Sequence, residues 1–148
     1  MLARTDRETR LIFPGLTGFY ASVSDLWYPM IRVAAGGFML YHGWGKFMGG
    51  VTPVAAIMAR NGIVPTTPFA YVVIFLETVG ALAIVLGLAT RFFAAALAIE
   101  MAIIAFVAQL PNGFARMELF LVLGIVYFAI ALRGGGPYSL DRKIGIEL

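Results

Sequence analysis

The sequence contains no cysteine and only one histidine, His42. Without cysteine, the chain cannot supply a disulfide relay, a thiolate nucleophile or the ligands of an iron–sulfur cluster. A lone imidazole is a weak metal ligand, and bis-histidine haem would need two copies of the chain. We also find no glycine-rich phosphate loop, no Ser/His/Asp ordering and no zinc-ligand spacing. We therefore predict no metal site, assign no catalytic residue and expect any redox centre to come from a partner protein.

Charge is also scarce. Charged residues make up 13% of the chain, 61% of the residues are hydrophobic, and the mean hydropathy is +0.90. Soluble domains carry about 25% charged residues, so the composition predicts a protein in contact with the lipid bilayer. The net charge of +3 comes largely from the tails, where basic residues of membrane proteins report orientation. We predict no nucleic-acid partner.

Long apolar stretches are abundant: residues 27–47, 69–88, 92–110 and 117–132. Each is close to the ~20 helical residues needed to cross a hydrocarbon core of ~30 Å. Between the first two stretches, Thr52, Pro53 and the later pair Asn61-Gly62 resemble the start and stop signals of a short helix. The predicted fold is all-α: an integral membrane four-helix bundle with a short interfacial helix between helices one and two.

We divide the chain into a cytoplasmic or interfacial segment (1–26), a four-helix transmembrane domain (27–133) and a cytoplasmic tail (134–148). Residues 1–26 lack the uninterrupted apolar core of a cleavable signal peptide, so we expect this segment to be retained. Four spans place both tails on one side, where we count seven basic residues in the tails and the second loop against three on the other side. The positive-inside rule then predicts that both termini are cytoplasmic.

Ionisable residues lie within or at the ends of all four stretches. Because a charge at mid-bilayer costs at least ~2.5–3.5 kcal/mol, such residues usually face one another or a wet cavity. Two interpretations stay open: interhelical pairs that fix register, or a polar pocket between helices. The pocket interpretation gives these ligand-binding candidates: Arg32, His42, Lys46, Glu77, Glu100 and Glu118.

The first stretch arranges its polar residues in a pattern. Arg32, Gly36, Met39, Gly43 and Lys46 follow at spacings of four and three, which places them on one helix face. Glycines on such a face permit close contact between helices.

Depth in the membrane suggests how these residues meet. Lys46 and Glu118 are expected at similar depth near the outer side, where we predict an ion pair. His42, Glu77 and Glu100 are expected nearer the middle. There an imidazole beside Lys46 and a glutamate would hydrogen-bond a quinone carbonyl and relay a proton near neutral pH. An interhelical hydrogen bond is the alternative for His42.

An ordered series of motifs resembles the DoxX family of small four-helix membrane proteins: RVAAGGFMLYHGWGK, FLETVGALAIVLGLATR, PNGFARMEL and GGGPYSLD. The resemblance covers about residues 27–142. It implies a bacterial or archaeal cytoplasmic-membrane protein, related to the membrane subunit of thiosulfate:quinone oxidoreductase and to proteins associated with oxidative-stress and thiol-homeostasis complexes. Its family-like polar positions are Arg32, His42, Lys46, Glu77, Arg91, Glu118, Ser139 and Asp141. Glu100 matches no motif, and its role is argued from depth alone.

The leading hypothesis is an inner-membrane subunit of a redox system that binds a quinone, or a similar lipid-soluble ligand, in a polar interhelical pocket. A non-catalytic anchor or accessory subunit of a larger complex is the main alternative, and a small-solute or proton carrier ranks last. Membership of such a family says more about fold than about reaction, so whether the chain is an enzyme stays open. A protein partner is expected in either leading case, and a homo-oligomer is a further option.

Overall fold

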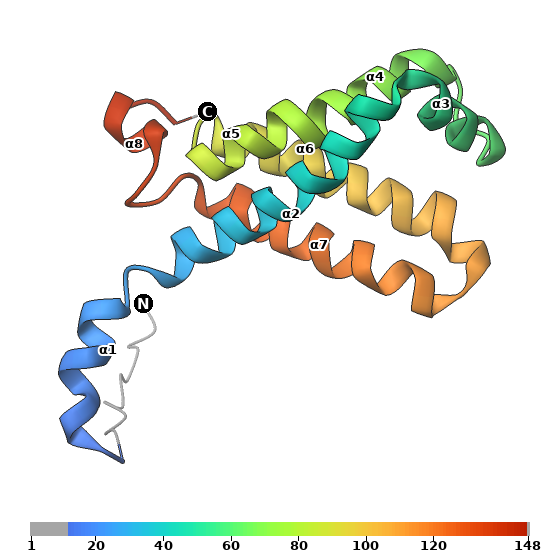
Figure 1. Cartoon of the computed structure of the whole chain (residues 1–148). Helices are drawn as coiled ribbons and strands as arrows, with labels where there is room; N and C mark the ends of the chain where they lie inside the picture. The colour runs from blue at the N-terminus through green and yellow to red at the C-terminus, as the bar shows by residue number, and fades with distance from the viewer. Residues whose placement is uncertain (1–11, 148) are drawn as a thin grey trace, which may run out of the picture.

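The computed structural model describes residues 12–147, and within that range every regular element is a helix (Figure 1). Residues 1–11 and Leu148 lie outside the described residues. The predictions that concern them, including three of the basic residues of the first segment, are therefore not addressed by the structure. The elements are η1 (Pro14–Leu16), α1 (Thr17–Val23), α2 (Trp27–Gly49), α3 (Val51–Arg60), α4 (Thr66–Phe75), η2 (Leu76–Gly80), α5 (Ala81–Leu86), α6 (Thr90–Ile103), η3 (Ile104–Gln109), η4 (Leu110–Asn112), α7 (Phe114–Arg133) and α8 (Leu140–Ile144).

Three continuous helical rods are long and apolar enough to cross a membrane: Thr66–Leu86, Thr90–Asn112 and Phe114–Arg133. The first joins α4, η2 and α5, the second joins α6, η3 and η4, and the third is α7. The fourth rod, α2, is 23 residues long and so reaches about 35 Å. Its Arg32, His42 and Lys46 leave it less apolar than the other three. The all-helical membrane bundle predicted from the sequence is confirmed.

The bundle is built from neighbouring pairs. In it α2 packs against η2 and α5, α6 packs against α7, and α3 folds back onto α4. In Figure 1, α3 and the α6–α7 turn lie at one end of the bundle, which we call the loop end. α8 and the α5–α6 turn lie at the other, which we call the tail end. The core between the rods includes Met39, Ile84, Leu97 and Tyr127, all at most 3% exposed.

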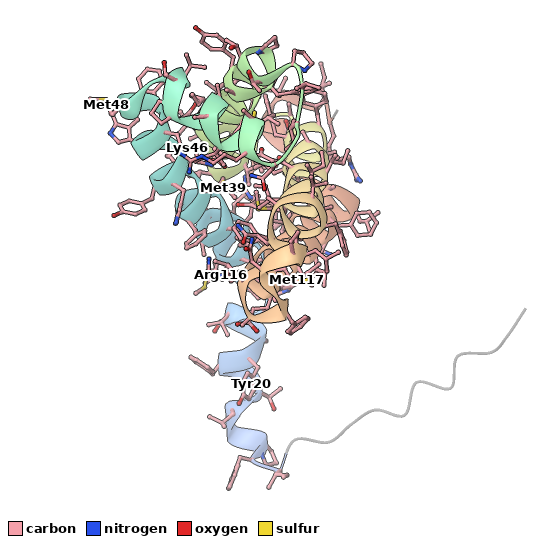
Figure 2. All side chains as sticks on the ribbon, turned by 90° about the vertical axis from the view of Figure 1, so that its right-hand side faces the viewer. Tyr20, Met39, Lys46, Met48, Arg116 and Met117 are labelled. Carbon is pink, nitrogen blue, oxygen red and sulfur yellow. The ribbon has the colours of Figure 1, made fainter. Side chains whose placement is uncertain are left out.

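The short helix between the first two rods exists, but it starts earlier than predicted. α3 spans Val51–Arg60 and its cap residue is Gly50, at φ +81°, so Thr52 and Pro53 lie inside the first turn. α1 stands apart from the bundle beside the tail end (Figures 1 and 2), with exposed Phe19 and Tyr20. An apolar helix in this place suits the membrane interface.

The small-residue face of α2 is where the bundle is tightest. A Cβ at Gly43 would overlap the Glu77 carbonyl group and come within 2.7 Å of the Glu77 Cβ. One added at Gly36 would lie 2.8 Å from Val85 Cγ2 and 3.0 Å from the Ala81 carbonyl oxygen. The predicted stripe from Arg32 to Lys46 therefore faces the α4–α5 rod, and glycine is what lets the two backbones touch.

Gly43→Ala should separate α2 from η2, because the atoms it would meet belong to backbone and cannot rotate away. We expect a loss of about 1–3 kcal/mol, measured by thermal unfolding in detergent. Gly37→Ala is the matched control, since a Cβ there meets nothing within 4 Å and alanine is the better helix former by about 1 kcal/mol. Equal stability of the two variants would contradict the close contact.

Candidate functional site

An ion pair between α2 and η2 forms the centre of the candidate site. Lys46 Nζ donates to Glu77 Oε1. The Glu77 side chain is 2% exposed and that of Lys46 is 34% exposed, so the buried carboxylate receives its counter-charge from the end of a longer chain. Glu77 lies in a turn of π-helix. Such turns inside α-helices frequently lie at functional sites.

Glu100 of α6 lies beside this pair, close enough to interact electrostatically with both Glu77 and Lys46. It is 6% exposed. Neither of its carboxyl oxygens, nor Oε2 of Glu77, has a hydrogen-bond partner among residues 12–147. Leaving a buried polar group unpaired costs about 1–3 kcal/mol, so such atoms call for an explanation. Lys46, Glu77 and Glu100 together are called the Lys46 cluster below.

Two adjoining cavities lie against the cluster. One, of about 480 Å³, has Lys46 in its wall together with residues of α3 and η3. The other, of about 360 Å³, has Glu100 in its wall among apolar side chains of α4 and α6. They share four lining residues: Met58, Ile63, Val73 and Ile104. Both volumes fall in the range of ligand pockets, about 300–1,000 Å³, and pockets typically combine apolar walls with few polar groups.

The predicted Lys46–Glu118 pair is wrong. Lys46 pairs with Glu77, and Glu118 is exposed near the start of α7. In Figure 2, Arg116 and Met117, which precede Glu118, lie well below Lys46, at the lower edge of the bundle. Equal depth placed both residues near the loop end correctly, but α2 packs on η2 and α5, and depth carries no information about which helices are neighbours.

His42 also lies away from the cluster. Its ring is exposed on the outer face of α2, where Nδ1 donates to the Phe38 carbonyl oxygen at 3.0 Å. The ring also packs against that of Phe38, with 4.4 Å between centroids. The interhelical position predicted for His42 is therefore wrong, because residues 42 and 43 are about 100° apart on a helix and it is Gly43 that faces η2.

Arg32 belongs to a second polar group, at the tail end. Its side chain is 2% exposed. Nη1 donates to the Ile84 carbonyl oxygen at 3.0 Å and Nη2 to that of Tyr138 at 2.6 Å, so the guanidinium joins α2, α5 and the C-terminal segment. Gly87, at φ +72°, leaves room for it, since a Cβ there would clash with Arg32 and Ser139.

The C-terminal segment folds back and caps α6. Asp141 Oδ1 accepts from the Ala89 amide at 2.7 Å, and Oδ2 accepts from the Thr90 amide at 3.0 Å and the Thr90 hydroxyl at 2.7 Å. The Asp141 amide donates to the Gly87 carbonyl oxygen at 2.8 Å. A carboxylate at a helix start satisfies free amides and complements the helix dipole. Ser139 caps α8, accepting from the Arg142 amide at 3.2 Å.

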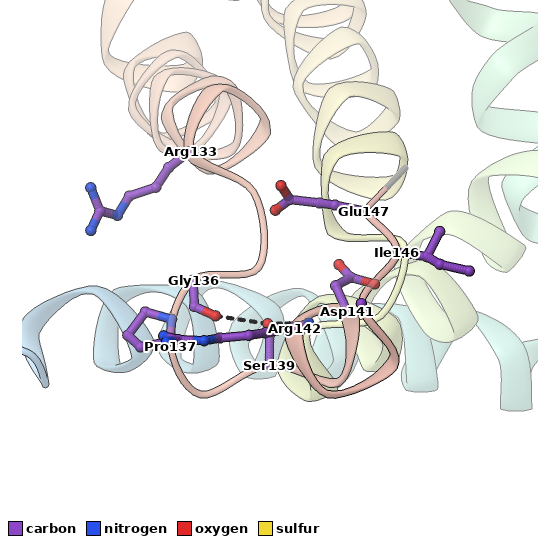
Figure 3. Close-up of a pocket in the computed structure, with 9 residues that line it drawn as sticks. Arg133, Gly136, Pro137, Ser139, Asp141, Arg142, Ile146 and Glu147 are labelled. Carbon is purple, nitrogen blue, oxygen red and sulfur yellow. Dashed lines mark hydrogen bonds between the residues drawn. The ribbon is translucent and has the colours of Figure 1, made fainter.

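A third cavity, of about 440 Å³, lies beside this segment (Figure 3). Arg133, Arg142 and Glu147 contribute to its wall together with Ser139 and Asp141. The side-chain oxygens of Ser139 and Asp141 are already engaged in hydrogen bonds, and Figure 3 shows Ser139 donating to the Gly136 carbonyl. Its buried polar groups therefore hold the fold together, in contrast to Glu100.

Of the six residues predicted as ligand-binding, the structure brings together Lys46, Glu77 and Glu100. Arg32, His42 and Glu118 lie elsewhere. Sequence reasoning gave no role to Thr90, Tyr28 or Tyr127, all of which are buried. Tyr28 donates to the Gly134 carbonyl oxygen and Tyr127 to that of Ala35, the latter at 2.8 Å. Among residues 12–147, no three His, Asp or Glu side chains meet as a metal-binding group.

A double-mutant cycle tests the ion pair. Lys46→Met leaves Glu77 buried without its partner, and we expect a loss of roughly 3–5 kcal/mol. Glu77→Gln should cost less, because the ammonium of Lys46 can turn to the surface. The double variant should lose less than the sum of the two, measured by thermal unfolding in detergent. The same cycle with Glu118→Gln should be additive, and coupling there would contradict the arrangement.

Asp141→Asn tests the capping of α6. The amide group cannot accept at both positions, so the segment should detach more readily, at a cost of about 1–3 kcal/mol. Cleavage by trypsin after Arg142 and Lys143 should accelerate roughly tenfold or more, because proteolysis follows the population of the open form. Glu147→Gln weakens the exposed pair with Arg91 and should have a smaller effect. Equal cleavage rates in the two variants would contradict the capping role.

The comparisons with known proteins agree with the fold. The DoxX family model matches residues 29–110, which is more than half of the chain and includes Lys46, Glu77 and Glu100. The last rod and the C-terminal segment lie beyond the match, so their likeness to the family motifs stays a prediction. Neither a curated protein nor a solved structure matches the chain. The match together with the helical membrane bundle shows that the chain belongs to the DoxX family.

Proposed function

We propose that this DoxX-family protein is a membrane subunit of a redox system that binds a quinone, or a similar lipid-soluble ligand, at the Lys46 cluster. The observation that carries the proposal is Glu100, a buried carboxyl group with two unpartnered oxygens in the wall of an apolar cavity. A structural ion pair accounts for Lys46 and Glu77. It does not account for a third ionisable group beside them.

The residues present fit such a ligand. A quinone needs donors for its carbonyl oxygens and an apolar space for its ring and tail. The ammonium of Lys46 has three donors, one of which goes to Glu77, and its cavity is otherwise lined mainly by apolar and glycine residues such as Val54, Ile57 and Met58. When bound, the quinone would supply electron-acceptor chemistry. The residues of this chain would bind and orient it and keep water away from it.

The chain has no cysteine and one histidine, and its polar cluster holds no group that itself exchanges electrons. We therefore propose that a partner protein supplies the redox centre. A cytoplasmic-membrane location in a bacterium or archaeon, cytoplasmic termini and homo-oligomer formation are part of the same proposal.

The second candidate function is a non-catalytic anchor. Its support is the unpartnered outer face of α2, where Tyr41 is 80% exposed and His42 lies beside it, together with the outlying α1. Helix faces of this kind suit contact with another membrane protein as well as with lipid. The anchor predicts stoichiometric partners after mild purification and no bound quinone.

Ligand binding can be tested with the purified protein in lipid nanodiscs and a decyl-substituted benzoquinone. At one hundred times the dissociation constant, a ligand raises the free energy of unfolding by about 2.7 kcal/mol, which is readily seen as a higher melting temperature. Lys46→Met should weaken binding about tenfold or more, because it removes the donor.

His42→Ala is the matched control, since His42 lies one turn from Lys46 but on the exposed face of α2. The His42→Ala variant should bind the quinone with the same affinity as the native protein. The proposal would be overturned if the purified protein carries no bound quinone and its melting temperature does not rise when quinone is added. If His42→Ala weakens binding as strongly as Lys46→Met does, the ligand lies on the outer face of α2 instead.

A further inference from the structure

We propose that Glu100 makes the site selective for a ligand that carries a hydroxyl group, so that the hydroquinone form binds more tightly than a form without hydroxyl hydrogens. This inference rests on the proposed function and adds the chemical form of the ligand. It follows from which hydrogen-bonding atoms the cluster leaves free.

The unpartnered atoms of the Lys46 cluster are acceptors. They are the two carboxyl oxygens of Glu100 and Oε2 of Glu77. A carboxyl group presents an acceptor oxygen in either protonation state, whereas it donates only when protonated. A carbonyl oxygen of a ligand is itself an acceptor and gains nothing from these atoms. A ligand hydroxyl would donate to Glu100 once its buried carboxyl group turns into the cavity that it lines.

No N–H or hydroxyl donor of residues 12–147 lies within hydrogen-bond distance of either Glu100 oxygen. Lys46 donates to Glu77, the Tyr127 hydroxyl donates to the Ala35 carbonyl oxygen, and the Thr78 hydroxyl donates to that of Ile74 at 2.5 Å. A proton shared between Glu100 and Glu77, whose carboxyl groups lie side by side, would satisfy one oxygen of each. The other oxygen of Glu100 remains an acceptor, and a ligand hydroxyl fits it.

The surroundings of Glu100 favour a ligand whose hydroxyl group is attached to an apolar ring or chain. Apart from Glu100 itself, the wall of its cavity is built only from Met, Ile, Phe, Val, Leu and Ala side chains. A divalent cation keeps several waters or takes several oxygen ligands, and the apolar wall of this cavity offers neither polar partners for those waters nor further ligands. A phenolic hydroxyl on an aromatic ring with an alkyl tail satisfies both the carboxyl group and the apolar wall.

The test compares three ligands on the native protein in nanodiscs: decyl-hydroquinone under anaerobic reducing conditions, its dimethyl ether, and the decyl-quinone. The ether keeps the ring and tail but has no hydroxyl hydrogen. We expect the hydroquinone to bind roughly tenfold more tightly than the ether, which corresponds to about one hydrogen bond. Dissociation constants are measured by calorimetry, so no enzyme turnover is needed.

Variants then assign the preference to Glu100. Glu100→Met removes both acceptors and should reduce the ratio of the two dissociation constants to about one, while the fold is kept because an apolar side chain replaces an unpaired buried group. Glu100→Gln provides a second variant of native shape, whose amide can donate to a carbonyl and should bring the quinone closer to the hydroquinone in affinity. Glu118→Gln, on an exposed glutamate of α7, should leave all three constants unchanged.

The outcomes separate the two proposals. If all three ligands fail to bind, the proposed function falls and this inference falls with it. If the quinone and the ether bind as tightly as the hydroquinone, the site exists but Glu100 does not select for a hydroxyl. A preference that survives Glu100→Met unchanged likewise overturns the assignment to Glu100.

Discussion

The backbone contact between α2 and η2 determines where the polar groups of this protein meet. At Gly43 the absence of a side chain lets α2 approach the Glu77 carbonyl group, and three residues later Lys46 reaches the Glu77 carboxylate. In lipid, helices gain little from hydrophobic burial, so van der Waals contact at small residues and polar contacts between helices carry the association. Here one short segment of η2 provides both, and the ion pair can form only because the glycine contact has brought the backbones together.

The two ends of the bundle use their buried polar groups differently. At the tail end, both terminal nitrogens of Arg32 and both carboxyl oxygens of Asp141 have partners at 2.6–3.0 Å, and of these two side chains only Nε of Arg32 has none. These partners come from segments far apart in the chain. Toward the loop end, Glu100 and one oxygen of Glu77 have none among residues 12–147. Satisfied networks make a structure rigid and unsatisfied ones lower its stability, so the tail end fixes the fold and the Lys46 cluster is the place where a ligand would act.

The sequence predicted the rods well because the apolar stretches leave few alternatives in a membrane. It also predicted the face of α2 from Arg32 to Lys46, since a spacing of three and four residues defines a helix face. The prediction of which charged residues pair with each other was wrong. Lys46 was assigned to Glu118 from depth, yet two small-residue faces were visible, one around Gly43 and one running from Glu77 to Gly80. Combining those faces would have favoured Glu77. The capping of α6 by Asp141 spans 51 residues of sequence, and no local pattern reports such a contact.

Glu100 poses the remaining physical question, because a buried acceptor without a donor lowers stability by about 1–3 kcal/mol. An apolar residue at this position would pack against the same wall of Ile99, Ile103 and Val73 without that loss. A proton shared with Glu77 would recover part of this loss, but the other oxygen of Glu100 would still have no donor in the empty bundle. Because functional sites often depart from the most stable arrangement, Glu100 points to the ligand more directly than the ion pair does. The ion pair of Lys46 and Glu77 would stabilise the bundle with or without a ligand, whereas a ligand that donates to Glu100 would supply a hydrogen bond that the empty bundle lacks.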